Sequence, residues 1–286
     1  MCGIFGVTAD RQAPHTILAG LKRLEYRGYD SWGIAVKGKD KIEIEKHAGK
    51  ISQSTTSLAN SSFGIGHTRW ATHGGATDAN AHPHLDCTRK LAIVHNGIID
   101  NWQDLKKEVG NHKLVSETDS EIVAHLIEDE LKTSDLEKSF IRVFKQVHGF
   151  NALIAIHQDY PYIMAGKTCS PLIIGVLPGS NLIASDVSSL LPLTQKVIFL
   201  EDGQIAKISK DQIDIIDVST LKKVRPHINH ISWSAASTNK GKYPHFMLKE
   251  IHEQPQIVLN LLNSKKYEID HLAEQINKSG DVYSVA

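Results

Sequence analysis

Alternating and continuous apolar runs over the first 218 residues predict many short β-strands separated by a few helices. The first run, from Gly3 to Val7, is apolar and β-prone. Residues 197–208 resemble a hairpin, because the turn dipeptide Asp202-Gly203 lies between two apolar runs. Further strands are expected at residues 42–46, 63–68, 91–95, 152–157, 172–176 and 181–184.

The clearest helix is expected at residues 119–132, where five apolar residues form one stripe at helical spacing. Thr118 and Glu121 have the spacing of a capping box, so the helix should begin there. Further helices are expected at residues 14–26 and 135–147. Many strands with a few amphipathic helices predict an α+β fold in which packed sheets are covered by helices.

The composition changes near residue 234. Residues 234–242 are small and polar, which is typical of a linker. Residues 246–263 should then form a helix interrupted at Pro255, and residues 282–286 resemble the opening of a buried strand without a partner. We therefore expect a longer natural polypeptide, with a main domain at 2–218, an extension and linker at 219–245, and the start of a further region at 246–286.

The charge balance and the apolar runs exclude several classes of protein. Lysine plus arginine equals aspartate plus glutamate at 32 each, so the basic excess of a nucleic-acid binder is absent. No apolar run approaches the ~18 residues of a membrane-spanning helix. The N-terminus lacks a basic leader, and three widely spaced cysteines form no disulfide framework. These features predict a cytoplasmic protein without nucleic-acid or membrane partners.

Cys2 is the first candidate for chemistry. Removal of Met1 would leave a free α-amine beside the Cys2 thiol, with an ordinary pKa of about 7.7–8.0. Such an amine can act as the general base for the thiol of its own residue, as in N-terminal-nucleophile enzymes. A cysteine at this position is more often an ordinary terminal residue, so the remaining residues decide between the two interpretations.

Two further segments carry groups that an amide-hydrolysing site requires. Asn96 and Gly97 follow the apolar strand 91–95 and could donate an amide NH₂ and a backbone N–H to an oxyanion, although Asn-Gly is also an ordinary turn. Arg69 is suited to a carboxylate and Asp119 to an ammonium group. Asp119 could instead only complement the start of a helix.

A metal site is not expected from the sequence. His73, His82, His84 and His95 are close along the chain, but Pro83 and its neighbours predict a loop, and no carboxylate or cysteine stands at a catalytic-zinc spacing. The other two cysteines, Cys87 and Cys169, have the character of structural or incidental residues.

Seven segments spread along the chain together resemble the class II, N-terminal-nucleophile glutamine amidotransferases. The N-terminal Cys2 and the His95-Asn96-Gly97 element are common to that family, whereas three others resemble its glucosamine-6-phosphate synthase branch in particular. The segments are MCGI (1–4), LEYRGYDS (24–31), HTRWATHG (67–74), NAHPH (80–84), VHNGIIDN (94–101), SETDSEIVAHL (116–126) and KEIHEQP (249–255).

The resemblance implies an αββα four-layer sandwich, the N-terminal nucleophile hydrolase fold, and a role for each matching residue. Cys2 is implied as the nucleophile. The oxyanion hole is implied at Asn96 and Gly97, with no cofactor and no metal. The remaining implied roles are Arg69 for the α-carboxylate of glutamine, Asp119 for its α-ammonium group, Trp70, Thr72 and His73 for the pocket and its closing loop, and Arg27 for support of the cysteine.

The resemblance also implies a substrate and a partner. The chain should hydrolyse L-glutamine to glutamate and ammonia, as the glutaminase half of a glutamine–fructose-6-phosphate aminotransferase (isomerizing) whose phosphosugar isomerase domain is missing here. A full-length enzyme of this family should be a homo-oligomer. Two alternatives stay open: another N-terminal-nucleophile amidohydrolase, and a domain that binds glutamine without turnover.

Overall fold

The computed structural model describes residues 2–9, 12–232 and 241–279. The chain divides into two units, residues 1–237 and 238–286, which are described separately.

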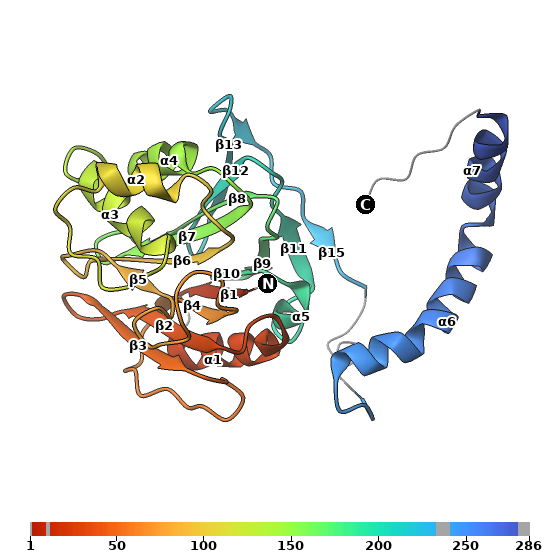
Figure 1. Ribbon diagram of the computed structural model, residues 1–286, viewed down its shortest axis with the longest axis horizontal. Coiled ribbons are helices and arrows are strands. Elements are labelled where there is room, and N and C mark those ends of the chain that lie inside the picture. Colours follow the sequence, from red (N-terminus) through yellow and green to blue (C-terminus); the bar gives the residue numbers. More distant parts are fainter. Residues whose placement is uncertain (1, 10–11, 233–240, 280–286) are drawn as a thin grey trace. The chain divides into compact units, whose positions relative to one another are not determined.

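The first unit is built on two antiparallel sheets that lie face to face (Figure 1). The eight-stranded sheet has the order β15-β11-β9-β10-β1-β4-β2-β3, and the seven-stranded sheet has the order β14-β13-β12-β8-β7-β6-β5. The strands of the first sheet are β1 (Gly3–Thr8), β2 (Ser31–Lys37), β3 (Ile42–Ala48), β4 (Phe63–Arg69), β9 (Ile173–Leu177), β10 (Ser180–Ala184), β11 (Lys196–Phe199) and β15 (Asn229–His230). Those of the second are β5 (His84–Leu85), β6 (Leu91–Asn96), β7 (Asn151–His157), β8 (Ile163–Thr168), β12 (Gln204–Ile208), β13 (Ile213–Asp217) and β14 (Lys223–Val224).

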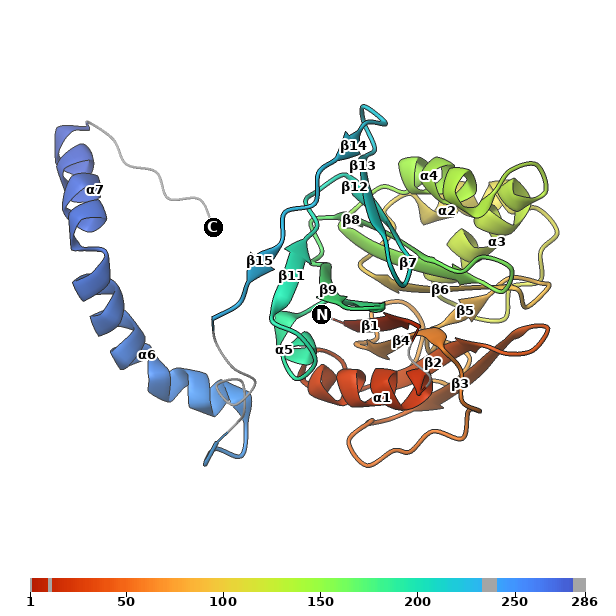
Figure 2. The same ribbon diagram turned by 180° about the vertical axis from the view of Figure 1, so that it is seen from behind.

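Helices cover the outer face of each sheet, as both views show (Figures 1 and 2). The eight-stranded sheet is covered by α1 (Ala13–Arg23), continued by the 3₁₀ turn η1 (Glu25–Arg27), and by α5 (Val187–Leu190). The seven-stranded sheet is covered by α2 (Trp102–Glu108), α3 (Ser120–Leu131) and α4 (Leu136–Gln146). The predicted α+β fold, with the αββα order of layers, is confirmed.

Side-chain alternation along the strands produces this layering. In β6, Leu91 and Ile93 pack against the helices, whereas Ala92 and Val94 enter the core between the sheets. Successive side chains of a strand point to opposite faces, so a strand covered on both sides is mostly apolar on both of its faces. This explains why the central strands appear in the sequence as continuous apolar runs.

The hairpin predicted at residues 197–208 is wrong. Its first strand, β11, pairs with β9 and β15 in one sheet, while its second, β12, pairs with β8 and β13 in the other. Gly203 does occupy a turn, with a φ of +75°. A turn dipeptide indicates only that the chain reverses its direction locally. It does not indicate with which strands the flanking segments pair, and here β11 and β12 pair in different sheets.

The capping box predicted at the start of α3 is also wrong. The N-cap residue is Asp119, one position later than expected, and its side chain makes no capping hydrogen bond. The Glu121 carboxylate accepts the backbone N–H groups of Val115 (2.8 Å) and Ser116 (2.7 Å) in the preceding loop. The hydroxyl of Thr118 is paired with Nε2 of His84 at 2.9 Å. Neither side chain caps α3, because Glu121 binds the loop just before the helix and Thr118 binds a residue of β5.

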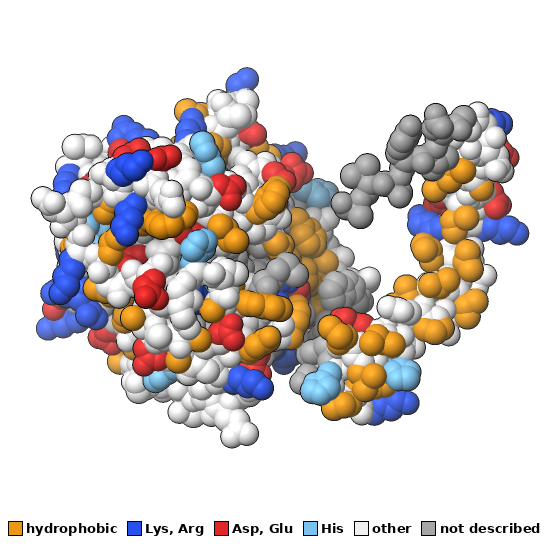
Figure 3. Space-filling model, in the orientation of Figure 1, with side chains coloured by type: hydrophobic (Ala, Val, Ile, Leu, Met, Phe, Trp, Pro, Cys, Tyr) orange, Lys and Arg blue, Asp and Glu red, His pale blue; other side chains and the backbone are white. Residues whose placement is uncertain are grey.

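The second unit consists of α6 (Phe246–Ser264) and α7 (Lys266–Lys278) in its described part. The interruption predicted at Pro255 is not observed, because α6 continues through it. Its described side chains include many exposed apolar groups, coloured orange in Figure 3. The strand predicted at 282–286 and most of the 234–242 linker lie outside the described residues. None of the helices in the described ranges combines the length and apolar character needed to cross a membrane.

Candidate active site

Strand register places Cys2 next to Arg69. Strand β1 pairs antiparallel with β4, with Gly3 opposite Thr68, so one step further along each strand brings Cys2 beside Arg69. Gly3 makes this approach possible, since a Cβ there would lie 2.5 Å from Oγ1 of Thr68 and 2.6 Å from Cβ of Leu24. The glycine after Cys2 thus has a packing role at the site.

The Cys2 thiol lies against the main chain of Trp70. The backbone N–H of Trp70 donates to Sγ at 3.3 Å, and Sγ lies 3.7 Å from the carbonyl oxygen of the same residue. Burial raises the pKa of the Cys2 thiol, while the Trp70 N–H and the nearby guanidinium of Arg69 act in the opposite direction. The thiol is therefore mainly protonated at neutral pH, so a nucleophilic role would need a base.

The main-chain oxygen of Cys2 is held from two sides. Nε of Arg27 donates to it at 3.3 Å and Nδ2 of Asn96 donates to it at 3.0 Å. Arg27 is itself buried and forms a 3.1 Å ion pair with Asp186, the residue that caps α5. These contacts anchor Cys2, the residue just before β1, to both the outer helix layer and the second sheet.

Asn96 and Gly97 lie where β6 ends. Nε2 of His67 lies 3.0 Å from Oδ1 of Asn96, and this contact orients the Asn96 amide so that its NH₂ group faces Cys2. Gly97 has a φ of +135°, and a Cβ on it would lie 2.0 Å from the carbonyl oxygen of Phe150. Only glycine fits this position without displacing the chain.

Arg69 and Asp119 are both buried. Nη1 of Arg69 donates to the carbonyl of Gly75 at 2.9 Å, and Nη2 donates to the carbonyls of His73 and Gly74. A guanidinium has five N–H donors, so at least two remain for another acceptor. The Asp119 carboxylate accepts the backbone N–H of Ile99 at 2.8 Å.

The loop after β4 carries Trp70, Thr72 and His73. Trp70 is 45% exposed and its ring lies 5.7 Å from that of Tyr29. The backbone N–H of Ala71 donates to the carboxylate of Asp30 at 2.8 Å. Thr72 is exposed, and the loop is thus anchored at its start while its tip faces solvent.

One pocket gathers most of the predicted site residues. Asn96 and Arg27 are not among its lining residues, but both contact the main-chain oxygen of Cys2. The lining residues are Cys2, Arg69, Trp70, Thr72, His73, His82, His95, Gly97, Thr118, Asp119 and Ser120.

Four histidines at this pocket, His67, His82, His84 and His95, are buried, and two of them, His82 and His95, line it. Burial lowers the pKa of each, in the case of His67 to about 3, so all four are neutral at physiological pH. The loop predicted around Pro83 gives way to strand β5 at His84, and the rings of His82 and His84 lie 4.5 Å apart. Both ring nitrogens of His95 contact Ser120 and Asn151 at 2.8 Å. Nδ1 of His67, Nε2 of His82 and Nδ1 of His84 have no hydrogen-bond partner within the described residues.

Comparison with known proteins adds independent evidence. Residues 67–192 match the family model described as a glutamine amidotransferase domain. The chain belongs to the class II glutamine amidotransferases. It is 41% identical to glutamine–fructose-6-phosphate aminotransferase (isomerizing) of Thermus thermophilus over 96% of this chain and 46% of the relative. The proteins of the same name from Thermococcus kodakarensis and Pyrococcus horikoshii are 42% and 44% identical, over 100% and 97% of this chain and 49% and 48% of theirs.

The chain thus spans about half the length of these curated relatives. Solved structures agree on the fold of this amidotransferase. One is the glutamine phosphoribosylpyrophosphate amidotransferase of B. subtilis, with a TM-score of 0.64 at 22% identity over 76% of this chain and 49% of that one. Another, titled as the allosteric regulatory enzyme of purine biosynthesis, has a TM-score of 0.65 at 24% identity with the same coverage.

Four residues that line the pocket of this amidotransferase have no predicted site role, namely His82, His95, Thr118 and Ser120. All four stand inside segments that carried the family resemblance, NAHPH, VHNGIIDN and SETDSEIVAHL. His82 and His95 had been considered only as metal ligands, and Thr118 only as a helix cap. Their positions inside the matching segments were the signal that could have identified them.

Proposed function

We propose that this amidotransferase domain hydrolyses L-glutamine to glutamate and ammonia, with Cys2 as the nucleophile. The observation that carries the proposal is the convergence of a thiol, a guanidinium and a carboxylate, from Cys2, Arg69 and Asp119, on one pocket. A free amino acid is the simplest substrate that requires all three groups: an amide to attack, an α-carboxylate and an α-ammonium group.

The proposed reaction begins with the thiol of Cys2. Removal of Met1 frees the α-amine of Cys2, which takes the thiol proton as Sγ attacks the carboxamide carbon of glutamine. The oxygen of the tetrahedral intermediate is stabilised by Nδ2 of Asn96 and the backbone N–H of Gly97. The amine then returns the proton to the leaving nitrogen, so ammonia departs and a thioester remains. Water hydrolyses the thioester to glutamate and restores the thiol.

Substrate binding is assigned to the surrounding groups. The free donors of Arg69 would hold the α-carboxylate, and Asp119 would hold the α-ammonium group. Trp70, Thr72 and His73 would cover the bound glutamine, which keeps water away and retains the ammonia. Arg27 would act through the main chain of Cys2, by holding its carbonyl oxygen in place.

We further propose that the ammonia serves glucosamine 6-phosphate synthesis from fructose 6-phosphate. Two findings support this: the enzyme name that the relatives share, and their length of about twice this chain. Residues 246–286 would then be the beginning of a phosphosugar isomerase region. The exposed apolar side chains of α6 and α7 would pack against the remainder of that region. A cytoplasmic homo-oligomer fits this role, and the three cysteines are free, as expected in a reducing compartment.

An amidohydrolase acting on fatty or aromatic amides is a less favourable alternative, because such acyl groups carry no charges to match Arg69 and Asp119. A domain that binds glutamine without turnover would retain Met1 and so keep the amine blocked.

The test combines the rate of glutamate release with covalent labelling of the nucleophile. Wild-type chain should release glutamate from glutamine, and Cys2→Ala should not, with Cys169→Ser as a control that removes another free cysteine. A glutamine-analogue diazoketone should label the wild type, and the mass of the N-terminal peptide should show both the label on Cys2 and the loss of Met1. Equal rates for wild type and Cys2→Ala, or labelling at another residue, would reject the proposal.

A further inference from the structure

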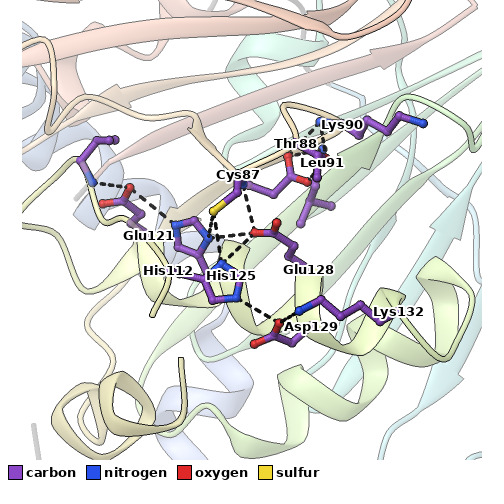
Figure 4. A network of polar contacts seen from close by, with 12 residues as sticks. Cys87, Thr88, Lys90, Leu91, His112, Glu121, His125, Glu128, Asp129 and Lys132 are labelled. Carbon is purple, nitrogen blue, oxygen red and sulfur yellow. Dashed lines mark hydrogen bonds and ion pairs between the residues drawn. The ribbon is translucent and has the colours of Figure 1, made fainter. Parts of the chain in front are cut away.

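A second cluster of reactive side chains lies outside the glutamine pocket, on the outer side of the seven-stranded sheet (Figure 4). It consists of Cys87, His112, His125 and Glu128, which are called the Cys-His-His-Glu cluster below. Cys87 follows β5, His112 lies between α2 and α3, and the other two residues stand one turn apart on α3. Their sequence separation explains why no ligand pattern was visible in the sequence.

The four candidate ligand atoms form a compact group. Sγ of Cys87 lies 3.2 Å from Nδ1 of His112 and 3.7 Å from Nδ1 of His125. One carboxylate oxygen of Glu128, Oε2, lies 3.2 Å and 3.0 Å from the same two nitrogens. All four atoms lie within 4.8 Å of one another. Zinc–ligand bonds of about 2.0–2.3 Å in a tetrahedron place the ligand atoms about 3.3–3.6 Å from one another. The four sulfur–nitrogen and oxygen–nitrogen distances given above, from 3.0 to 3.7 Å, lie around that range.

The far side of each imidazole ring faces a carboxylate. Nε2 of His112 is 3.0 Å from Oδ1 of Asp129, whereas Nε2 of His125 lies 3.8 Å from Oε1 of Glu121, beyond hydrogen-bond distance. Histidines that bind metals through one ring nitrogen typically donate the other N–H to a carboxylate, which fixes the ring and its tautomer. Glu121 is in turn held by the backbone N–H groups of Val115 and Ser116. The cluster therefore has an outer shell as well as four ligands.

We propose that the Cys-His-His-Glu cluster binds one Zn²⁺ ion in a structural site. With the ion bound, the thiolate and the carboxylate would supply two negative charges and the coordinated imidazoles none, so the charge of the ion would be balanced. Mixed sulfur and nitrogen ligands favour zinc over magnesium or calcium. Four protein ligands leave no open position for substrate, so the ion would have a structural role.

The ion would join three segments that are otherwise connected through loops: the turn after β5, the chain before α3, and α3 itself. The first turn of α3 follows Asp119, which lines the glutamine pocket. Zinc at this cluster would thus stabilise the helix that positions one wall of that pocket, without taking part in the reaction.

Metal titration of the untagged 286-residue chain tests the site. Chelator-stripped wild type should take up one equivalent of Zn²⁺, and Co²⁺ in its place should give a thiolate-to-cobalt charge-transfer band. Cys87→Ser should lose that band, while the matched variant Cys169→Ser, which removes the other exposed cysteine, should keep it. Asp129→Asn changes only the outer shell and should weaken zinc binding about 10–100-fold.

Circular dichroism of each stripped variant shows that it is folded, and a competing chromophoric chelator measures its affinity. Zinc should also raise the thermal midpoint of wild type and of Cys169→Ser, but not that of Cys87→Ser. The proposal is overturned if wild type and Cys87→Ser bind zinc equally well, or if the cobalt spectrum lacks a thiolate band. Because none of these readouts uses glutamine, they are independent of the glutaminase assay.

Discussion

The side-chain amide of Asn96 donates a hydrogen bond to the main-chain oxygen of Cys2 at 3.0 Å, although the two residues come from different sheets. This contact orients one amide hydrogen toward the main chain of the proposed nucleophile and leaves the second for the oxygen of the tetrahedral intermediate. The two sheets therefore have to be packed together before the proposed oxyanion hole can exist.

Replacing Asn96 with alanine should lower kcat for glutamine hydrolysis about 10²–10³-fold, because one oxyanion donor is lost. KM should change little, since the amide is not assigned to the charged ends of glutamine. Steady-state glutamate release measures both constants. Asn101→Ala is the control, because Asn101 also donates a side-chain hydrogen bond, to the carbonyl of Gln146, away from the pocket residues. Equal kcat values for the two variants would remove Asn96 from the mechanism.

Gly97→Ala should destabilise the fold far more than Gly179→Ala. Both glycines have positive φ, but a Cβ on Gly97 would lie 2.0 Å from the carbonyl oxygen of Phe150, whereas a Cβ on Gly179 meets nothing within 4 Å. The control should therefore show only the backbone cost of about 1–2 kcal/mol for an L-residue in this region. Urea denaturation measures both free energies of unfolding, and similar losses would mean that the loop at Phe150 relaxes freely.

Arg69→Lys should raise KM for glutamine about 10–100-fold, because a single ammonium group replaces a planar fork of donors. The same change releases the carbonyls of His73 and Gly75, so the loop after β4 should also close less tightly. The control is Arg142→Lys, since Arg142 is half exposed and pairs with Glu130 on the protein surface. An unchanged KM would show that another group holds the α-carboxylate.

Buried neutral His67 should make the fold sensitive to acid. Burial lowers its pKa to about 3, whereas in the unfolded chain its pKa is near 6.5. Between these two pH values the unfolded state binds one more proton than the folded state. The contribution of His67 to the free energy of unfolding is therefore complete above about pH 6.5 and falls by about 1.4 kcal/mol per pH unit below it.

His67→Gln removes one of the four buried neutral histidines, so it should reduce the slope of the unfolding free energy against pH between 6 and 5 by up to about 1.4 kcal/mol per pH unit. The measurement is urea denaturation at several pH values. His15→Gln is the matched control, because His15 is exposed on α1, and it should keep the wild-type slope. If His67→Gln keeps the wild-type slope of the unfolding free energy against pH, then His67 does not contribute to the acid sensitivity of the fold.

The sequence by itself predicted many of the strands, the layered fold class and the residue types of the proposed site, although β2, β8 and β13 were not among the strands expected from it. Apolar runs such as 91–94 indicate burial directly, because a strand covered on both faces has few polar positions. Short motifs such as His95-Asn96-Gly97 predict a local turn together with its hydrogen-bond donors, the side-chain amide of Asn96 and the backbone N–H of Gly97. Both signals lie within a few consecutive residues, so no information about the rest of the chain was needed.

Only the tertiary structure decided which groups meet. The Asp202-Gly203 turn was visible, but not that β11 and β12 join different sheets, because pairing depends on the faces offered by distant strands. Glu121 had the spacing of a capping residue, yet it accepts N–H groups of the preceding loop. Cys87 was interpreted as structural or incidental, because its nearest titratable partners lie 25 and more residues away in the chain. Contacts across such separations form only when the layers pack.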